Sequence, residues 1–292
     1  MGAAVLFAVG ATIQQRVASR TDVGGRRVDP LLLVKLFAQP VWLVGFFLTL
    51  ANFSMAATAL AKGRLVVVEP ILACGLLLAL PLSAAVGKGR MARRDWIAAG
   101  AAAAGLSLFL VLAAPTKGAD TVGSGPLAAV VLSIEAAVLV LAVLTSRFVR
   151  RFLSVALGAA AGVMAATTDA CTKTVAQLAG THHLGVFGDP RLWLLTVAGL
   201  TTFTIQQNAY RAAGLAASLP AIAVLHPTTG ALLGIALYDE VIHTGALHLF
   251  GELIAAALAV WGIVTLARSP LIELVHPLAG SEQAAQATPS PR

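Results

Sequence analysis

Three polar residues spaced four apart interrupt an otherwise apolar stretch of the sequence: Asp169, Lys173 and Gln177. Residues at this spacing lie on one face of a helix, and Thr168 and Thr172 broaden that polar face. If the stretch spans a membrane, such ionisable residues are energetically costly and become candidates for function. Two interpretations are open for Asp169 and Lys173: an ion pair within the helix that neutralises itself, or a pair that lines a cavity and meets a substrate or relays a proton.

Glu69 is a second candidate, because it directly precedes Pro70 inside the apolar run Leu65–Leu72. Proline is favoured in the first turn of a helix, so Glu69 could be an acid near a helix N-terminus that the helix dipole stabilises. Alternatively, Pro70 and Pro220 break matching helices in two halves of the chain, which is a sequence sign of a transporter's binding site. Glu69 would then face a cavity and bind a cation or a proton.

A third group consists of polar residues that stand in apolar stretches without an obvious partner. Glu135 lies in the middle of a predicted helix and is expected to be protonated or paired across helices. Gln207 and Asn52 belong to polar stripes on two other predicted helices, where amides often join transmembrane helices. His226, next to Pro227, is more typical of packing than of a switch. The residues expected to line a substrate or ion site are Glu69, Asp169, Lys173, Gln14, Asn52 and Gln207.

The composition decides which kind of protein must position these residues. The sequence has 292 residues, of which 58% are hydrophobic and 11% charged, and its mean hydropathy is +0.87. Soluble domains carry about 25% charged residues, so this chain lacks the polar surface of a water-soluble globule. Its apolar content excludes a disordered chain, and the two cysteines, Cys74 and Cys171, lie in apolar runs, which excludes a disulfide-built secreted domain. The composition predicts a polytopic α-helical membrane protein.

Apolar stretches of spanning length predict about nine transmembrane helices in an all-α bundle. Their ranges are 1–17, 39–61, 65–86, 95–114, 125–147, 152–178, 192–213, 216–238 and 246–268. The segment Leu31–Phe37 is apolar but contains Lys35, so we expect an interfacial lead-in to the second helix, with a tenth short span as the alternative. Residues 1–270 are expected to form one transmembrane domain, and 277–292 a disordered cytoplasmic tail.

The distribution of basic residues predicts the orientation of these helices. Of the 20 lysines and arginines, 15 fall in the odd-numbered loops and after the last helix, whereas Lys173 lies within a span. The even-numbered loops hold four: Lys62, Arg64, Lys117 and Arg191. This bias places the N-terminus outside and the C-terminus in the cytoplasm. The net charge of +7 therefore reflects membrane topology, and nucleic acid is not an expected partner.

The sequence also resembles itself at an offset of 150 residues. Leu60 precedes Pro70 by ten residues, as Tyr210 precedes Pro220, and a tryptophan opens the preceding helix in both cases. Because the offset corresponds to five crossings, an odd number, the two repeats would have opposite orientations, which is a recurrent transporter architecture. The chain would then consist of a first repeat, a connecting helix and a second repeat: 1–115, 125–147 and 152–270.

A family resemblance rests on the same segments. In order, they are Trp42–Gly45, Asn52-Phe53, Ala59-Leu60, Val66–Pro70, Asp95, Gly100, Gly105 and Ala114-Pro115, then Tyr210, Pro220 and Leu237–Glu240. The pattern resembles the drug/metabolite transporter superfamily, and most of all its branch of NIPA-like magnesium transporters and bacterial EamA-like proteins. Over about residues 1–270, this resemblance implies inverted repeats, with nine helices as in the NIPA-like branch. The first repeat has no acid equivalent to Glu240, so we expect a capping or loop role for Glu240 rather than a binding role.

The expected function is secondary transport of a small solute by alternating access across the cell membrane, with a proton on Glu69 or Asp169 as the coupling ion. The resemblance implies an alternative, transport of Mg²⁺ by carboxylates such as Glu69, Glu135 and Asp169. A third hypothesis is a membrane scaffold subunit without transport. No arrangement typical of catalysis occurs in the sequence, so we expect neither an enzyme nor a cofactor. A homodimer is left open.

Overall fold

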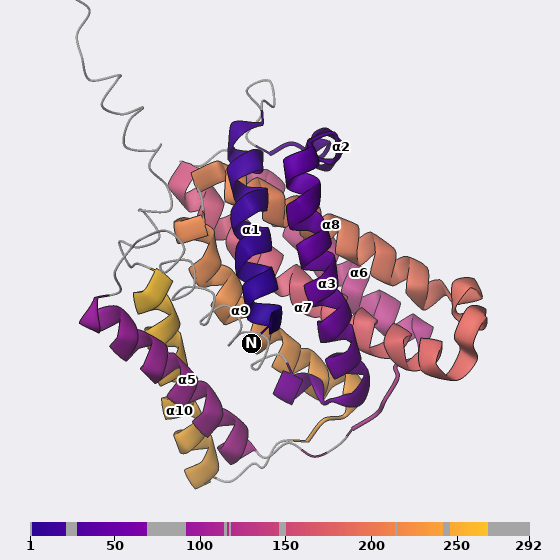
Figure 1. Cartoon of the computed structure of the whole chain (residues 1–292). Coiled ribbons are helices and arrows are strands. Elements are labelled where there is room, and N and C mark those ends of the chain that lie inside the picture. The colour runs from indigo at the N-terminus through magenta and orange to yellow at the C-terminus, as the bar shows by residue number, and fades with distance from the viewer. Residues whose placement is uncertain are drawn as a thin grey trace, which may run out of the picture.

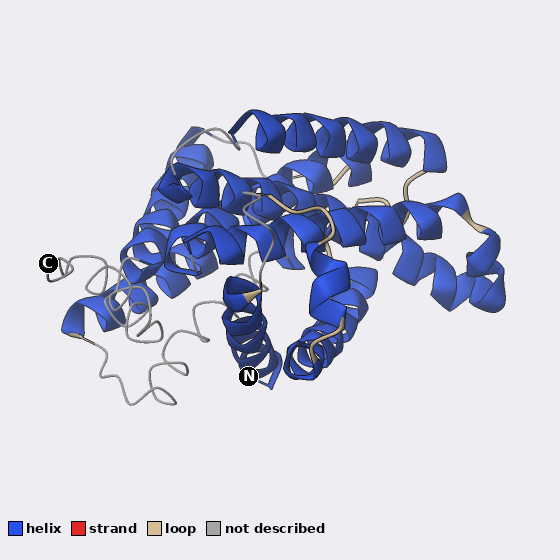
Figure 2. Ribbon diagram, turned by 90° about the horizontal axis from the view of Figure 1, so that it is seen from above, coloured by secondary structure: helices blue, strands red, loops and turns tan. Residues whose placement is uncertain are grey.

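The chain folds into helices throughout the residues that the structure describes. This computed structural model describes residues 2–21, 28–68, 92–113, 116, 118–145, 150–213, 215–241 and 246–267. Its elements are α1 (Gly2–Arg20), α2 (Leu32–Phe37), α3 (Pro40–Lys62), α5 (Arg93–Ala113), α6 (Ser124–Thr145), α7 (Arg150–His182), the short helix η1 (His183–Gly188), α8 (Pro190–Ala213), α9 (Leu215–Tyr238) and α10 (Ala246–Ala267). Figures 1 and 2 show their arrangement, which contains no strand within the described ranges. The predicted all-α class is confirmed.

Eight of the predicted spans coincide with long helices. The span predicted at 39–61, for example, is α3, which begins at Pro40 because proline suits the first position of a helix. The first four residues of the span predicted at 65–86 are helical. Its remainder, with the predicted site residues Glu69 and Pro70, lies outside the described residues, as does the predicted C-terminal tail. The count of nine helices therefore stays a prediction.

The segment before α3 forms a helix of its own. α2 has six residues and a length of about 9 Å, which is too short to cross a bilayer. Its buried residues Leu32, Leu33 and Leu36 pack with Trp42 at the start of α3. This packing gives the predicted lead-in the form of a short helix held against the bundle.

α7 is the central helix of the described part. It has 33 residues and a length of about 50 Å, and it packs against α3, α6, α8 and α9. Its middle part is buried on every side between residues 166 and 175. Polar side chains in that part are therefore held between helices.

α5 and α10 form a close pair, which Figure 1 shows side by side. Two glycines allow the two backbones to approach each other. A Cβ atom on Gly105 would lie 2.6 Å from the backbone oxygen of Ala255, and one on Gly262 would lie 2.5 Å from the backbone oxygen of Ala98. Small residues at such crossings are typical of helix packing in lipid.

The packing is compatible with the exchange of helices that the sequence repeat predicts. That exchange pairs α1 with α7, α3 with α8, and α5 with α10. Both α1 with α3 and α7 with α8 are packed pairs, α3 contacts α7 as α1 contacts α8, and α5 packs on α10. The two repeat-related tryptophans differ, because Trp42 is fully buried and Trp193 is 62% exposed. The inverted repeat stays a prediction.

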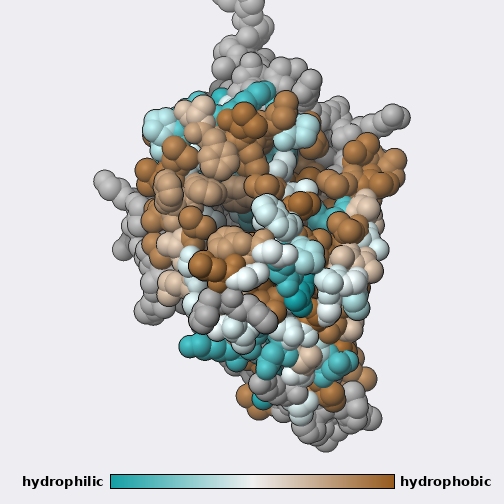
Figure 3. All heavy atoms as spheres, turned by 90° about the vertical axis from the view of Figure 1, so that its right-hand side faces the viewer, coloured by the Kyte–Doolittle hydropathy of each residue, from teal (hydrophilic) through white to brown (hydrophobic). Residues whose placement is uncertain are grey.

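Large apolar side chains lie on the outer surface of several helices. Examples are Val41, Val44 and Phe47 of α3, Leu132, Val140 and Val143 of α6, and Leu253, Ile254 and Trp261 of α10. Figure 3 shows broad areas of hydrophobic residues, in brown, on one face of the molecule. By length and composition, α3 and residues 124–141 of α6 are each able to cross a membrane, and α9 and α10 contain shorter apolar stretches. For the other helices, crossing stays a prediction.

Candidate functional site

Between residues 167 and 174, α7 carries polar side chains that contact different neighbouring elements. We call this segment the polar belt. Thr167 contacts α6, Thr168 contacts α8, Asp169 contacts α9, and Lys173 contacts the segment after α9. Successive residues of a helix point about 100° apart, so the adjacent polar residues of this segment face different neighbouring elements. The polar stripe predicted from residues 169 and 173 is therefore one side of a wider belt.

Lys173 forms a buried ion pair with Glu240. The Nζ atom of Lys173 lies 2.5 Å from Oε1 of Glu240 and 4.2 Å from the centre of the Tyr238 ring. The side chains of Lys173 and Glu240 are only 4% and 0% exposed, which removes the pair from water. Glu240 also accepts hydrogen bonds from the backbone N–H groups of Leu65, at 2.7 Å, and Val66, at 2.8 Å. The carboxylate is thus bound by three donors.

Glu240 caps a helical segment that is distant from it in the sequence. At the end of α9, Asp239 has φ 53°, in the left-handed region that aspartate tolerates better than most residues. The backbone N–H of Glu240 then donates to the carbonyl of Gly234 at 3.1 Å. This turn brings the carboxylate to the helix start at Leu65, where it satisfies N–H groups and the helix dipole. The geometry agrees with the expected capping role, but nothing in the sequence indicated Lys173 as a partner.

Asp169 pairs with His226 of α9 and not with Lys173. Its Oδ2 atom lies 2.9 Å from Nε2 of His226, and the side chains of aspartate and histidine are 12% and 22% exposed. The interpretation of Asp169 and Lys173 as an ion pair within the helix is therefore wrong. Spacing places Asp169 and Lys173 on one face, but each side chain reaches a different neighbouring element. Thr168 shares a hydrogen bond of 2.9 Å with Thr202 of α8 beside this pair.

Two predicted binding residues, Gln14 and Gln207, are in direct contact. Nε2 of Gln207 donates to Oε1 of Gln14 at 2.8 Å, and Nε2 of Gln14 donates to Oγ1 of Thr49 at 2.8 Å. Nε1 of Trp42 donates to Oε1 of Gln207 at 3.5 Å. This amide cluster joins α1, α3 and α8. Asn52, also predicted, is half-buried on α3 and makes no side-chain hydrogen bond to a described residue.

A further polar contact ties the segment before α2 to α8. The backbone N–H of Asp29 donates to Oδ1 of Asn208 at 2.9 Å, and Nδ2 of Asn208 donates to the carbonyl of Asp29 at 3.1 Å. Lys35 of α2 lies 2.9 Å from the carboxylate of the same aspartate. These contacts fix a predicted cytoplasmic loop against the end of α8.

Two further acids lie within predicted spans. Glu135 of α6 accepts hydrogen bonds from Thr201 of α8, at 2.6 Å, and Thr167 of α7, at 3.4 Å, which agrees with the expectation of pairing across helices. Glu252 of α10 was missed by the sequence interpretation. It is 5% exposed, and its Oε1 atom has no hydrogen-bond partner among the described residues. A lone acid in the apolar run of a predicted span was the signal that would have identified it.

Pro220 does not break α9, which corrects the expectation that this residue interrupts its helix. α9 runs continuously from Leu215 to Tyr238 across it. A proline removes the hydrogen bond to the residue four positions earlier, and for Pro220 that residue is Ala216, in the first turn. The loss therefore falls where the helix is least regular. Pro70, its predicted counterpart, lies outside the described residues.

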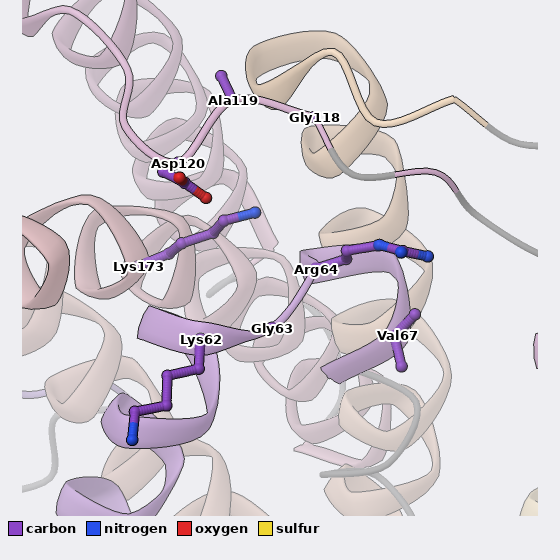
Figure 4. A pocket seen from close by; sticks show the side chains of 8 residues that line it. All are labelled: Lys62, Gly63, Arg64, Val67, Gly118, Ala119, Asp120 and Lys173. Atoms are coloured by element: carbon purple, nitrogen blue, oxygen red, sulfur yellow. The ribbon is translucent and has the colours of Figure 1, made fainter.

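A pocket of about 320 Å³ lies beside Lys173 (Figure 4). Its lining consists of Lys62, Gly63, Arg64, Val67, Gly118, Ala119, Asp120 and Lys173. The loop that carries Ala119 is held in place because its backbone N–H donates to the carbonyl of Tyr238 at 2.6 Å. Lys173 and Asp120 point toward one another, whereas Lys62 and Arg64 extend outward at the rim. The sequence could not reveal this pocket, because three distant segments form it.

These features describe a helical protein with buried charged and amide groups inside and apolar side chains outside. Comparison with known proteins adds one distant relative. The chain is 26% identical over 245 residues to an uncharacterized protein of Corynebacterium glutamicum, and the match covers 82% of this chain and 83% of the relative. No family model matches the sequence, and no solved structure matches the chain.

Proposed function

We propose that the protein is a membrane-embedded secondary transporter that moves a small solute by alternating access. The observation that carries this proposal is the distribution of polarity. Ionised and amide side chains such as Asp169, Lys173 and Gln207 are buried, whereas many large apolar side chains face outward. Soluble proteins bury apolar residues and expose charged ones. In lipid, polar groups must find their partners inside the protein, and these do.

α3 and α6 supply the clearest part of this argument. Only 17% of the apolar window of α3 and 22% of that of α6 are buried inside the protein. A helix that forms the core of a soluble protein would be mostly buried. Exposed apolar surface on this scale marks an interaction with a partner or a membrane, and a bilayer fits two helices of spanning length.

The contacts between loops support the predicted grouping of the loops on two sides of the membrane. At the predicted outer side, the backbone N–H of Thr116 donates to the carbonyl of Val241 at 2.8 Å, and Glu240 binds the segment at Leu65. At the predicted cytoplasmic side, Asp29 binds Asn208. Loops assigned to the same side by their charges are thus the ones that contact each other. The resemblance to the drug/metabolite transporter superfamily supports the same function.

The transport path in this proposal runs between the helices of the two repeats. In transporters with inverted repeats, the substrate lies at the interface of the repeats near the middle of the bilayer. The contact between Gln14 and Gln207 joins the two repeats, and Asp169 lies on the central helix of the second repeat. Asp169 and His226 form the proposed proton site, because both are partly exposed and histidine changes its charge between about pH 5 and 8.

Transport of Mg²⁺ remains the second candidate. A magnesium ion is bound through one or two carboxylates and several waters. Glu135 and Asp169 are held by different partners, and no group of three acids, histidines or cysteines gathers within the described ranges. Glu69 lies outside those ranges. No described contact favours the magnesium alternative over a small solute.

Solute flux into proteoliposomes tests the proposal. Purified protein would first be screened by thermal unfolding against amino acids, nucleosides, organic cations and Mg²⁺, since a ligand of the folded state raises stability. Flux of any stabilising solute is then compared among the wild type, Asp169→Asn and Glu69→Gln. Glu135→Gln is the matched control, because it removes a membrane acid from the connecting helix. Unchanged transport in both Asp169→Asn and Glu69→Gln would contradict the proposed site.

The membrane orientation needs a separate test. In a background with Cys74 and Cys171 replaced by alanine, single cysteines at Asp120 and Lys35 would be exposed to a membrane-impermeant thiol reagent in intact cells. We expect labelling at position 120 and protection at position 35. Labelling at both positions in intact cells, or the reverse pattern, would contradict the topology.

A further inference from the structure

We propose that the pocket beside Lys173 binds the acidic group of a small organic anion, a carboxylate or a phosphate, at the outer end of the transport path. This inference rests on the transport function proposed above and names its substrate class. Three cationic side chains line the pocket, from Lys62, Arg64 and Lys173, against one acidic side chain, from Asp120. A cavity with this lining attracts negative charge.

The neighbouring acid Glu240 does not cancel this attraction. Its carboxylate already binds Lys173 and the backbone N–H groups of Leu65 and Val66. An ammonium group has three N–H donors, and Glu240 takes one of those of Lys173. With Glu240 counted, the charged side chains of the lining and this carboxylate together still carry one net positive charge.

The placement of Lys62 and Arg64 runs against the general charge bias of the chain. Only four basic residues lie in the predicted outer loops, and these two line the pocket. Arg191, another of the four, is bound by Asp189 at 2.6 Å and by the carbonyl of Val122 at 3.0 Å. Hydrogen bonds to Asp189 hold this guanidinium in a structural contact, and they raise the pKa of Arg191. A binding role explains why Lys62 and Arg64 are present on the outer side.

The shape of the pocket suits one small acidic solute. Its volume of about 320 Å³ is at the lower end of the range for small-molecule sites. Gly63, Gly118 and Ala119 contribute no more than backbone and one methyl group to the lining. Figure 4 shows Lys173 reaching into the pocket and Arg64 at its rim. Arg64 lies at the rim of the pocket, and the planar fork of an arginine is able to bind a carboxylate or phosphate through two parallel hydrogen bonds.

An anion in this position also acts on the ion pair at the pocket floor. The bound anion shares the ammonium of Lys173 with Glu240, which weakens the attraction between Lys173 and Glu240. Glu240 holds the helix start at Leu65 and Val66 to the end of α9. Binding of the solute therefore loosens the contact that closes the outer end, which is the coupling that alternating access requires.

The test measures thermal unfolding of the detergent-purified full chain with sodium phosphate or sodium lactate, against sodium chloride at equal ionic strength and against choline chloride. We expect a saturable rise in Tm with phosphate, lactate or both, because a ligand of the folded state stabilises it. The double variant Lys62→Gln/Arg64→Gln should weaken this binding by about tenfold or more, the typical effect of losing hydrogen bonds to a charged group. Arg191→Gln is the matched control and should retain wild-type affinity.

A variant with the opposite sign separates binding from a folding defect. Asp120→Asn removes the one acid of the lining and should tighten anion binding, which damage to the fold would not do. Equal shifts in the wild type and the double variant, or no shift with either anion, would overturn the inference. A rise in Tm that depends on Lys62 and Arg64 but occurs only in vesicles containing phosphatidylglycerol would assign the pocket to a lipid headgroup. This result would overturn the inference that the pocket binds a small solute.

Flux in proteoliposomes distinguishes failure of this inference from failure of the transport function. Uptake of a cationic or neutral solute without anion binding would overturn the pocket's assignment and leave the transport function standing. Saturable anion binding that depends on Lys62 and Arg64, without uptake of any solute, would support the site and contradict transport. Uptake of the bound anion, reduced in the double variant, is the expected result.

Discussion

Two charged pairs lie one turn apart on α7, and they differ in almost every respect. The side chains of Lys173 and Glu240 are only 4% and 0% exposed, and two backbone N–H groups complete the shell of the carboxylate. Asp169 and His226 are partly exposed, and histidine is the side chain type that commonly serves as a proton switch. The first pair holds segments together, whereas the second can respond to a proton.

This difference teaches which buried charge is structural and which is available for function. Burial alone does not separate the two pairs, because Asp169 and Lys173 are both buried. The two pairs differ in the number of donors around the carboxylate and in the access of the carboxylate to water. Substitutions at Glu240, Asp169, Tyr238 and Thr202 test this distinction.

Glu240→Gln should have the largest effect on stability. It leaves the buried ammonium of Lys173 without a counter-charge, and breaking a buried pair in this way costs about 3–5 kcal/mol. The measurement is the free energy of unfolding in detergent. Asp239→Asn is the control, because Asp239 is an exposed acid next to Glu240 and asparagine tolerates its φ of 53°. If Glu240→Gln lowered the free energy of unfolding by less than about 1 kcal/mol, the pair of Lys173 and Glu240 would not be the one that holds the segments together.

Asp169→Asn should affect transport more than stability. Loss of a hydrogen bond to a charged group costs about 1.5–3 kcal/mol when buried, and the partial exposure of this pair places the cost at the lower end. The dependence of solute flux on pH between about 5 and 8 should disappear. His226→Gln should flatten the same profile, whereas Glu135→Gln should preserve it. A profile that survives in both Asp169→Asn and His226→Gln would remove the second pair from the mechanism.

Tyr238→Phe should cost about 1 kcal/mol. The hydroxyl of Tyr238 shares a hydrogen bond of 2.8 Å with Thr174 and donates to the carbonyl of Ala170. Phenylalanine loses these contacts but keeps an aromatic ring near Lys173. Thermal unfolding measures the effect, and Tyr238→Leu, which also removes the ring, should cost more. Equal values for the two variants would show that the ring contact with Lys173 contributes nothing.

Thr202→Val should have the smallest effect, about 0.5 kcal/mol, which is near the average for side-chain hydrogen bonds between membrane helices. Its hydroxyl bonds Thr168 next to the pair of Asp169 and His226. We expect thermal unfolding to change little and the flux profile against pH to keep its shape. If Thr202→Val were as destabilising as Tyr238→Phe, the surroundings of the two pairs would be equally rigid, against the comparison made above.

The positions of the helices could be predicted from the sequence because apolar runs end at prolines and charged residues. α3 and α9 were expected at 39–61 and 216–238 and are found at Pro40–Lys62 and Leu215–Tyr238. The length of an apolar run is a local property, and the bilayer thickness sets it. For these two helices the difference is at most one residue at either end, within the range over which helix ends fray, whereas α7 extends four residues beyond its predicted end.

The partners of the charged side chains could not be predicted in the same way. Spacing along α7 gives the face that Asp169 and Lys173 share, but it does not say which neighbouring helix lies opposite. Glu240 was treated as a helix end, and its partner Lys173 is 67 residues away in the sequence. The hydrogen bond between Gln14 and Gln207 joins residues that lie 193 positions apart in the sequence. Such contacts depend on how helices pack, and the sequence of one helix does not contain that information.

The three donors around Glu240 have a mechanical consequence. Lys173 belongs to α7, Leu65 and Val66 begin another helical segment, and Glu240 follows α9, so one carboxylate joins three parts of the chain. Partial release would leave a buried charge with an incomplete shell, which is less stable than either the fully bound or the fully hydrated carboxylate. Opening of the outer end should therefore be cooperative. A single-molecule distance recording between labels at Arg64 and Val241 would then show two dwell levels and abrupt jumps between them.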